Sequence, residues 1–235
     1  MHMEVRINKY LSEAGVCSRR EADRLIEAGK VMIDGKSAIT GSKVTDGQVI
    51  KVNGTTVTKE EELILLAFNK PVGVVCTTTD KQGKNNIVDY IGYEKRIYPV
   101  GRLDKDSQGL ILMTNDGDTM NKILKSVNGH EKEYVVEVDK SVTEEFIHKM
   151  SNGIYLEALD RKTDQCFVKK EGKFSFRIIL TQGLNRQIRR MSESLGYKVT
   201  RLERIRIMNI KLAGIPLGQY RKVSDEEYRK LCSML

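Results

Sequence analysis

The chain has 235 residues, of which 40% are apolar and 31% are charged, and its formal net charge is +8 at pH 7. This length allows one large domain or two unequal ones, and the ordinary apolar fraction indicates a globular protein with a real core. The excess of cations favours a polyanionic partner such as nucleic acid, or less often an acidic membrane surface.

The cysteines and the hydropathy pattern exclude several further classes. No C-x-x-C pair occurs and the three histidines do not lie near the cysteines, which argues against a zinc site or a disulfide framework. The longest apolar run, residues 63–68, is far too short to span a bilayer, and the start of the chain lacks a signal-peptide core. We therefore expect a soluble cytoplasmic protein with no membrane partner and no metal. The four cysteines are Cys17, Cys76, Cys166 and Cys232.

Two short helices and a set of small strands are predicted at the amino-terminal end. Apolar residues at helical spacing indicate a first helix over residues 7–14. Ser18 then caps a second helix, with Glu21 three residues later to complete a capping box, and Gly29 ends it. Short strands with turn pairs between them are expected at residues 30–33 and 48–52. Together these elements predict a small αα/β domain over residues 1–54.

The polar face of the second helix carries Arg19, Arg20 and Arg24. Charge alone allows two interpretations of this face. It is either a solvated surface, softened by the acidic residues around it, or a surface that binds RNA phosphates.

A polar linker over residues 55–62 precedes a larger domain over residues 63–235. Strands and helices alternate irregularly in this larger domain, which predicts an α+β fold around a mostly antiparallel mixed sheet. Strands are expected at residues 63–68, 74–77, 97–100, 110–114, 134–138, 174–180 and 204–212. Helices are expected at residues 120–127, 144–150 and 185–195.

The loop over residues 102–109 holds two carboxylates between apolar runs, and three interpretations of it compete. A calcium loop would use Asp104 and Asp106 as its first and third positions, but the twelfth position is Asn115 where a bidentate glutamate is needed. A structural turn would use both aspartates to accept hydrogen bonds from backbone amides. A catalytic carboxylate would need a guanidinium nearby to keep it ionised.

Four segments of the larger domain carry a resemblance to a known family. They are G-R-L-D-K-D-S-Q-G-L at 101–110, N-K-P-V-G at 69–73, K-E-Y at 132–134 and Q-G-L-N-R-Q-I-R-R-M at 182–191. In this order they are similar to the motifs of the RNA pseudouridine synthases, in the RsuA branch and closest to the enzymes of the large ribosomal subunit. The run from Arg6 to Lys36 resembles the RNA-binding module named after ribosomal protein S-four.

This resemblance implies an activity, the isomerisation of uridine to pseudouridine in RNA, that needs no cofactor. It implies that Asp104 is the nucleophile, attacking either the ribose or the uracil ring. Tyr134 would stack on the uracil and move its C5 proton, and Arg189 would pair with Asp104 from a helix face that points away from the core. Leu202 would pack against the base, and Arg102 would enter the stack that the flipped uridine leaves, or simply pair with Asp106.

Further basic residues are expected to bind the substrate. Seven cations against two glutamates between residues 186 and 206 are typical of a phosphate-binding groove. The expected partner is a stem-loop of 23S ribosomal RNA, with a transfer RNA as a second candidate, no DNA, and a monomeric enzyme. The alternative is a non-catalytic RNA-binding or ribosome-assembly factor that uses the same surfaces. The other substrate-binding candidates are Arg186, Arg190, Lys9, Arg19 and Arg20.

Overall fold

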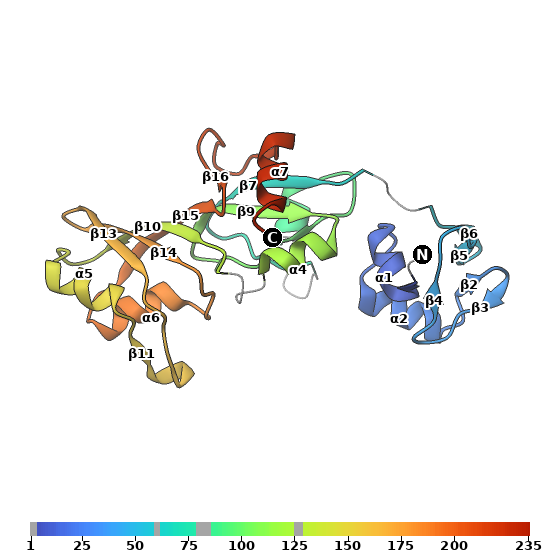
Figure 1. Cartoon of the computed structure of the whole chain (residues 1–235), viewed down its shortest axis with the longest axis horizontal. Helices are drawn as coiled ribbons and strands as arrows, with labels where there is room; N and C mark the ends of the chain where they lie inside the picture. The colour runs from blue at the N-terminus through green and yellow to red at the C-terminus, as the bar shows by residue number, and fades with distance from the viewer. Residues whose placement is uncertain (1–3, 59–61, 79–85, 125–128) are drawn as a thin grey trace. The chain divides into compact units, whose positions relative to one another are not determined.

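The structure, a computed structural model, describes residues 4–58, 62–78, 86–124 and 129–235 (Figure 1). The chain divides into a small unit, residues 1–63 with 115–117, and a large unit, residues 64–114 and 118–235. Each unit has its own hydrophobic core.

The small unit contains the two predicted helices, α1 (Ile7–Glu13) and α2 (Arg19–Glu27). The Ser18 side chain caps α2 by accepting a hydrogen bond from the Glu21 amide at 3.2 Å, as the sequence predicts. Ile7, Leu11 and Ile26 pack these helices onto a four-stranded sheet. The strands of that sheet, in spatial order, are β3 (Lys36–Ser37), β2 (Val31–Ile33), β5 (Ile50–Val52) and β6 (Thr55–Thr56); β1 (Val5–Arg6) pairs separately with β4 (Lys43–Val44).

A nine-stranded sheet organises the described part of the large unit. Its pairs are antiparallel, except that β15 and β9 run parallel and pair over only two positions. The predicted α+β class with a mostly antiparallel sheet is confirmed. The spatial order is β13 (Phe167–Gly172), β14 (Ser175–Leu180), β10 (Lys132–Val138), β15 (Val199–Ile207), β9 (Gln108–Thr114), β7 (Leu65–Lys70) and β17 (Tyr220–Lys222), with β16 (Ile210–Lys211) on β15 and β8 (Tyr98–Pro99) on β9.

The sheet is covered differently along its width. β7 and β9 are apolar along nearly their whole length because both of their faces are buried, whereas β10 and β14 alternate because one of their faces is open to solvent. On one face, α3 (Ile87–Ile91), α5 (Glu144–Ser151) and α6 (Gln187–Ser194) contribute to the main core. On the other face, α4 (Gly117–Leu124) and α7 (Asp225–Cys232) cover a second core (Figure 1). A β11–β12 hairpin (Tyr155–Leu156 and Arg161–Lys162) encloses a short 3-10 helix, Glu157–Leu159.

Two predicted strands are wrong. Residues 74–77 form only an isolated bridge between Val75 and Asn86, because the Val74 carbonyl is used by a side chain instead of a sheet partner. The predicted strand 204–212 is divided between β15 and β16 by a turn at Met208, whose φ is +51°. The helix expected at 120–127 starts earlier, at Gly117, and residues 125–127 lie outside the described ranges.

Candidate active site

The loop that connects β8 to β9 lies beside the pairing of β9 with β15, the parallel pair of the large sheet. β9 begins at Gln108, and its parallel pairing with β15 involves only Gln108 and Gly109. Gly109 has a φ of +105°, and a Cβ atom there would lie 2.4 Å from the Arg204 carbonyl oxygen. The close approach of the two strands therefore requires glycine at this position.

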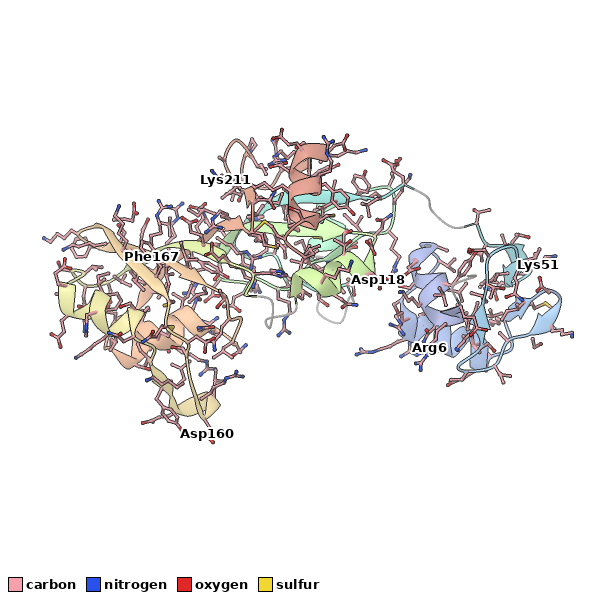
Figure 2. The ribbon with its side chains drawn as sticks, in the orientation of Figure 1. Arg6, Lys51, Asp118, Asp160, Phe167 and Lys211 are labelled. Atoms are coloured by element: carbon pink, nitrogen blue, oxygen red, sulfur yellow. The ribbon has the colours of Figure 1, made fainter. Side chains whose placement is uncertain are left out.

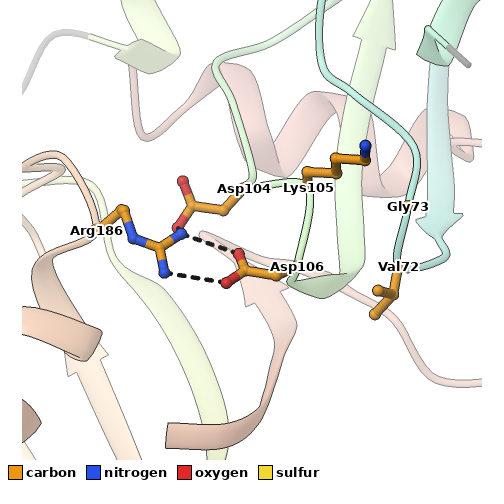
Figure 3. Close-up of a pocket in the computed structure, with 6 residues that line it drawn as sticks. All are labelled: Val72, Gly73, Asp104, Lys105, Asp106 and Arg186. Atoms are coloured by element: carbon orange, nitrogen blue, oxygen red, sulfur yellow. Dashed lines mark hydrogen bonds and ion pairs between the residues drawn. The ribbon is translucent and has the colours of Figure 1, made fainter.

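A hollow of about 350 Å³ opens beside this loop (Figure 3). Both carboxylates predicted to matter lie in it, and one third of the Asp104 side chain is exposed. The lining residues are Val72, Gly73, Asp104, Lys105, Asp106 and Arg186.

Arg186 closes one side of the hollow from the start of α6. Its guanidinium donates two hydrogen bonds to the Asp106 carboxylate, at 3.1 and 3.0 Å, and lies 3.8 Å from Asp104 Oδ2. Its backbone is left-handed, with a φ of +51°, a conformation that costs free energy for any residue except glycine. Such strain is typical of positions that serve a site, and Arg186 was selected from the sequence only as one cation of a group.

The two carboxylates have different surroundings. Burial alone would raise the pKa of Asp106, but Arg186 and Arg189 outweigh it and hold that pKa below its ordinary value. The Asp104 carboxylate has only the 3.8 Å contact with Arg186 among the described residues. Because two guanidinium groups occupy Asp106, the loop does not offer the ligand set that a calcium ion needs.

Arg189 does not lie where the sequence predicted. The structure pairs it with Asp106, at 3.4 Å from Nε to Oδ2, and not with Asp104. It also does not point away from the core: its side chain is 8% exposed. Its other guanidinium nitrogens donate to the carbonyls of Asp106 (2.8 Å) and Val199 (3.3 Å) and to Ser107 Oγ (3.1 Å). Helical spacing predicts on which face of the helix Arg189 lies. It does not predict that a strand and a loop pack against that face and bury the side chain.

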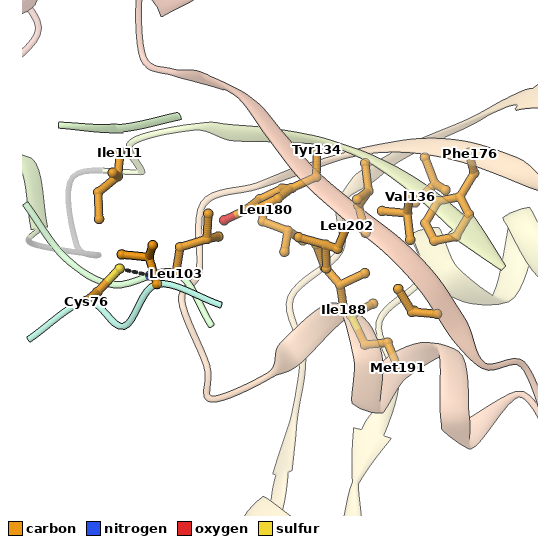
Figure 4. Close-up of a cluster of buried hydrophobic side chains, with 14 of the residues drawn as sticks. Cys76, Leu103, Ile111, Tyr134, Val136, Phe176, Leu180, Ile188, Met191 and Leu202 are labelled. Carbon is orange, nitrogen blue, oxygen red and sulfur yellow. Dashed lines mark hydrogen bonds between the residues drawn. The ribbon is translucent and has the colours of Figure 1, made fainter. Parts of the chain in front are cut away.

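Tyr134 and Leu202 lie on neighbouring strands and on one face of the sheet. Leu202 pairs with Val136, two residues after Tyr134, so the two side chains enter the same core cluster. In Figure 4 the Tyr134 hydroxyl points toward the end of the cluster that Leu103 occupies. Leu103 directly precedes Asp104, so this core cluster includes the neighbour of the loop carboxylate, although neither Tyr134 nor Leu202 lines the hollow.

Lys70 was quoted only as part of a motif, but it is completely buried beside the loop. Its Nζ donates to the carbonyls of Pro71 and Val74, both at 2.9 Å. Burial lowers the pKa of Lys70, and the nearby Asp104 carboxylate is among the groups that oppose this shift. A lysine at the end of a continuous apolar strand was the sequence signal for such a position.

Arg204 was missed as well, and it holds both ends of the loop. Its Nε donates to the Leu110 carbonyl at 2.6 Å, and its Nη1 donates to the Arg102 carbonyl at 3.5 Å. The side chain comes from β15, so it ties the loop over residues 102–109 to the neighbouring strand. No local pattern in the sequence marked it apart from the other arginines of this region.

The remaining candidates are not brought into the hollow. Arg102 is exposed and does not pair with Asp106, which Arg186 occupies instead. Arg190 donates to the Asn185 carbonyl and side chain, at 3.1 and 3.2 Å.

In the small unit, Lys9 pairs with Glu13 at 3.5 Å, whereas Arg19 and Arg20 are both exposed on α2.

The basic groove predicted over residues 186–206 is wrong as a single surface. Arg189 and Arg204 are buried and hold the loop, as described above. Arg201 pairs with Glu137 and Glu203, at 3.1 and 3.0 Å, and Arg206 pairs with glutamates of the open sheet face. These four cations are therefore already engaged within the protein.

Comparisons with known proteins agree on one family. Residues 64–194 match the family model described as RNA pseudouridylate synthase, and residues 5–50 match the S4 domain. The dual-specificity RNA pseudouridine synthase RluF of Escherichia coli is 56% identical over 98% of this chain and 79% of its own length. The ribosomal large subunit pseudouridine synthase B of Bacillus subtilis is 36% identical over 96% of this chain and 95% of its own length.

A solved structure described as a pseudouridylate synthase has a TM-score of 0.71 with this chain at 27% identity. It covers 97% of this chain, and this chain covers 99% of it.

Among the described residues, no helix has both the length and the apolar character needed to cross a bilayer. On the family match and on the identity to its relatives, the chain belongs to the RNA pseudouridine synthase family and isomerises uridine to pseudouridine in RNA.

Proposed function

We propose that Asp104 is the nucleophile of this reaction and that its substrate is a stem-loop of 23S ribosomal RNA. The main support for Asp104 is that the two carboxylates of the hollow differ in their partners. Asp106 is bound by Arg186 and Arg189, whereas Asp104 is one third exposed and is held only at 3.8 Å by Arg186. A carboxylate whose oxygens are open to a ligand, with its neighbouring guanidinium bound to another carboxylate, is suited to nucleophilic attack.

The other residues follow from the reaction. The bond between ribose C1′ and uracil N1 breaks and a bond from C1′ to C5 forms. C5 loses its proton and N1 gains one, so the product is an isomer of the substrate. We assign Tyr134 to stack on the uracil ring, with its hydroxyl taking the C5 proton as it passes its own proton on, and Leu202 to pack against the base. We assign Arg189 to positioning, since its hydrogen bonds to the Asp106 carbonyl and Ser107 hold the loop that carries the nucleophile.

The choice of RNA rests on the relatives. One relative is named for the large ribosomal subunit and the other for dual specificity. We assign RNA binding to residues 1–54, with Lys9, Arg19 and Arg20 contacting phosphates, and catalysis to residues 63–235. Of the expected linker 55–62, Thr55 and Thr56 belong to the small sheet as β6. Arg186 and Arg190 would add phosphate contacts near the hollow, and Arg102 would fill the stack after the uridine leaves it. A transfer RNA is the second substrate to test, and we propose a cytoplasmic monomer.

Tritium release tests the assignment of the nucleophile. 23S ribosomal RNA with tritium at uridine C5 is incubated with the parent protein, with Asp104→Asn and with Asp106→Asn. The parent should release tritium, and Asp104→Asn should release none above background, because an amide cannot act as the nucleophile. Asp106→Asn should retain measurable release, because it only loosens the support of the loop.

The same experiment separates enzyme from binding factor. Undiminished release by Asp104→Asn would contradict the assignment of Asp104. No release by the parent protein, combined with tight RNA binding, would favour the non-catalytic alternative for this RNA.

A further inference from the structure

Val72 is an apolar side chain at the rim of the hollow, and 57% of its surface is exposed. It lies on the opposite side of the two carboxylates from Arg186 (Figure 3). Single exposed apolar residues are common on protein surfaces and need no special cause. Val72 differs from them in its position, since it lines the same space as the proposed nucleophile.

The turn that carries Val72 is braced from both sides. The buried Lys70 ammonium bonds the carbonyls of Pro71 and Val74, which flank the Val72–Gly73 peptide, at 2.9 Å each. The Gly73 amide donates to the Lys105 carbonyl at 2.7 Å, and its φ of +94° needs glycine. The exposed valine is therefore held at a fixed position relative to Asp104, as contact residues of a site are.

The size of the hollow indicates what meets this side chain. Its volume, about 350 Å³, lies at the low end of small-ligand sites, which span roughly 300–1,000 Å³. A hollow of this size matches a single flipped base better than a longer segment, so the nucleotides on either side would lie at its rim. A strand that delivers a flipped uridine to the hollow is bent there, so the base of a flanking nucleotide can be splayed toward the rim, and proteins contact unstacked bases with apolar or aromatic side chains.

We propose that Val72 packs against the base of a nucleotide directly adjoining the flipped uridine. This inference rests on the proposed function, because it takes the hollow beside Asp104 as the place of the uridine. Val72 takes no part in bond making. Its contact exists before and during the reaction, so it contributes to substrate affinity and to the preference for the flanking nucleotide but not to kcat.

Substitution of the valine gives the first test. RNA affinity and steady-state kinetics are measured on a stem-loop substrate for the parent, Val72→Ala and Phe167→Ala. Val72→Ala should weaken binding and raise KM roughly threefold to tenfold, the loss expected for about two methyl groups of contact, with kcat and Tm unchanged. Phe167 is a matched exposed apolar residue on β13, at the far end of the sheet order (Figure 2), and its substitution should change none of these values.

Substrates that lack one base give the decisive test. An abasic nucleotide is placed in turn on the 5′ and 3′ side of the target uridine, and Kd is measured with the parent and with Val72→Ala. At the contacted position, removal of the base should weaken binding to the parent clearly more than binding to Val72→Ala, because the two changes delete the same contact. Independent effects at both positions would overturn the proposal.

Measurement of Kd beside turnover keeps the two proposals apart. A parent protein that binds the stem-loop but forms no pseudouridine would contradict the proposed function for this RNA, while the abasic comparison would still decide whether Val72 contacts the flanking base.

Discussion

Asp104 and Asp106 are two residues apart in the sequence, yet their carboxylates have different partners. Asp106 receives two guanidinium groups, and Asp104 faces the hollow with a third of its side chain exposed. The motif resemblance had given a catalytic role to Asp104 alone. The structure adds the reason, since Arg186 and Arg189 reach Asp106 from the first turn of α6.

Gly109 is the residue on which the geometry of the loop depends most directly. Gly109→Ala should lower the free energy of unfolding by at least about 2 kcal/mol, because its positive φ is strained for alanine and the new Cβ would meet the Arg204 backbone at 2.4 Å. Chemical denaturation measures this change. Gly183 is the control, since a Cβ there meets no atom within 4 Å and its φ is not positive. Equal stabilities of the two alanine variants would contradict the prediction.

At the scale of elements, ion pairs link the strands on the open face of β10 and β14, whereas apolar side chains pack on the other face. Glu133 on β10 bonds Arg206 of β15 and Arg177 of β14, both at 2.5 Å. This cluster crosses three strands, and it engages Arg206, one of the cations that the sequence assigned to a phosphate-binding groove. Loss of this carboxylate's charge should be destabilising, because it is only 13% exposed and the two guanidinium groups would lose their partner.

Glu133→Gln should therefore destabilise the protein in a pH-dependent way. Burial raises the pKa of Glu133, but hydrogen bonds from Arg206 and Arg177 outweigh it and leave the pKa below its ordinary value. A carboxyl whose pKa is lowered by folding stabilises the fold above its unfolded pKa and loses this contribution as pH falls through its folded pKa. The difference in unfolding free energy between parent and variant should be on the order of 2 kcal/mol at pH 7 and should vanish at strongly acidic pH.

Urea denaturation across pH 2 to 8 measures this difference. Glu145→Gln is the control, because Glu145 and Lys149 form an exposed pair on a single helix. This control should change stability little at any pH. A loss in Glu133→Gln that is as large in acid as at neutral pH would show that the ion cluster is not its cause.

At the scale of the whole molecule, the net charge of +8 is distributed between free and engaged cations. RNA binding should weaken steeply with salt because phosphate contacts release counterions. Arg20→Ala should reduce the slope of log affinity against log salt by about 0.7 to 0.9, since Arg20 is exposed on α2 of the S4 domain.

Arg201→Ala provides the control for this prediction. Arg201 is bound to Glu137 and Glu203, so its removal should leave the salt slope unchanged. Filter binding or fluorescence anisotropy at several salt concentrations gives both slopes. A larger effect from Arg201 than from Arg20 would mean that RNA uses the open face of the large sheet.

The sequence by itself determined the family, the α+β class and most of the local elements. Three features show why. The Ser18 cap, the apolar run of β7 and the alternation along β14 each depend on residues that are close together in the sequence, so the sequence alone predicts them. The motif around Asp104 was equally legible, because its residues are contiguous.

Only the tertiary structure decided which groups surround that loop. Arg186 and Arg189 lie 80 and 83 residues from Asp106, and Arg204 lies 94 residues from Leu110. Whether an arginine faces solvent, a glutamate or a backbone carbonyl depends on strand register and on packing across the sheet. Local periodicity carries no information about either. For this reason Arg189 was assigned to Asp104 instead of Asp106, and the contacts of Arg204 with both ends of the loop were overlooked.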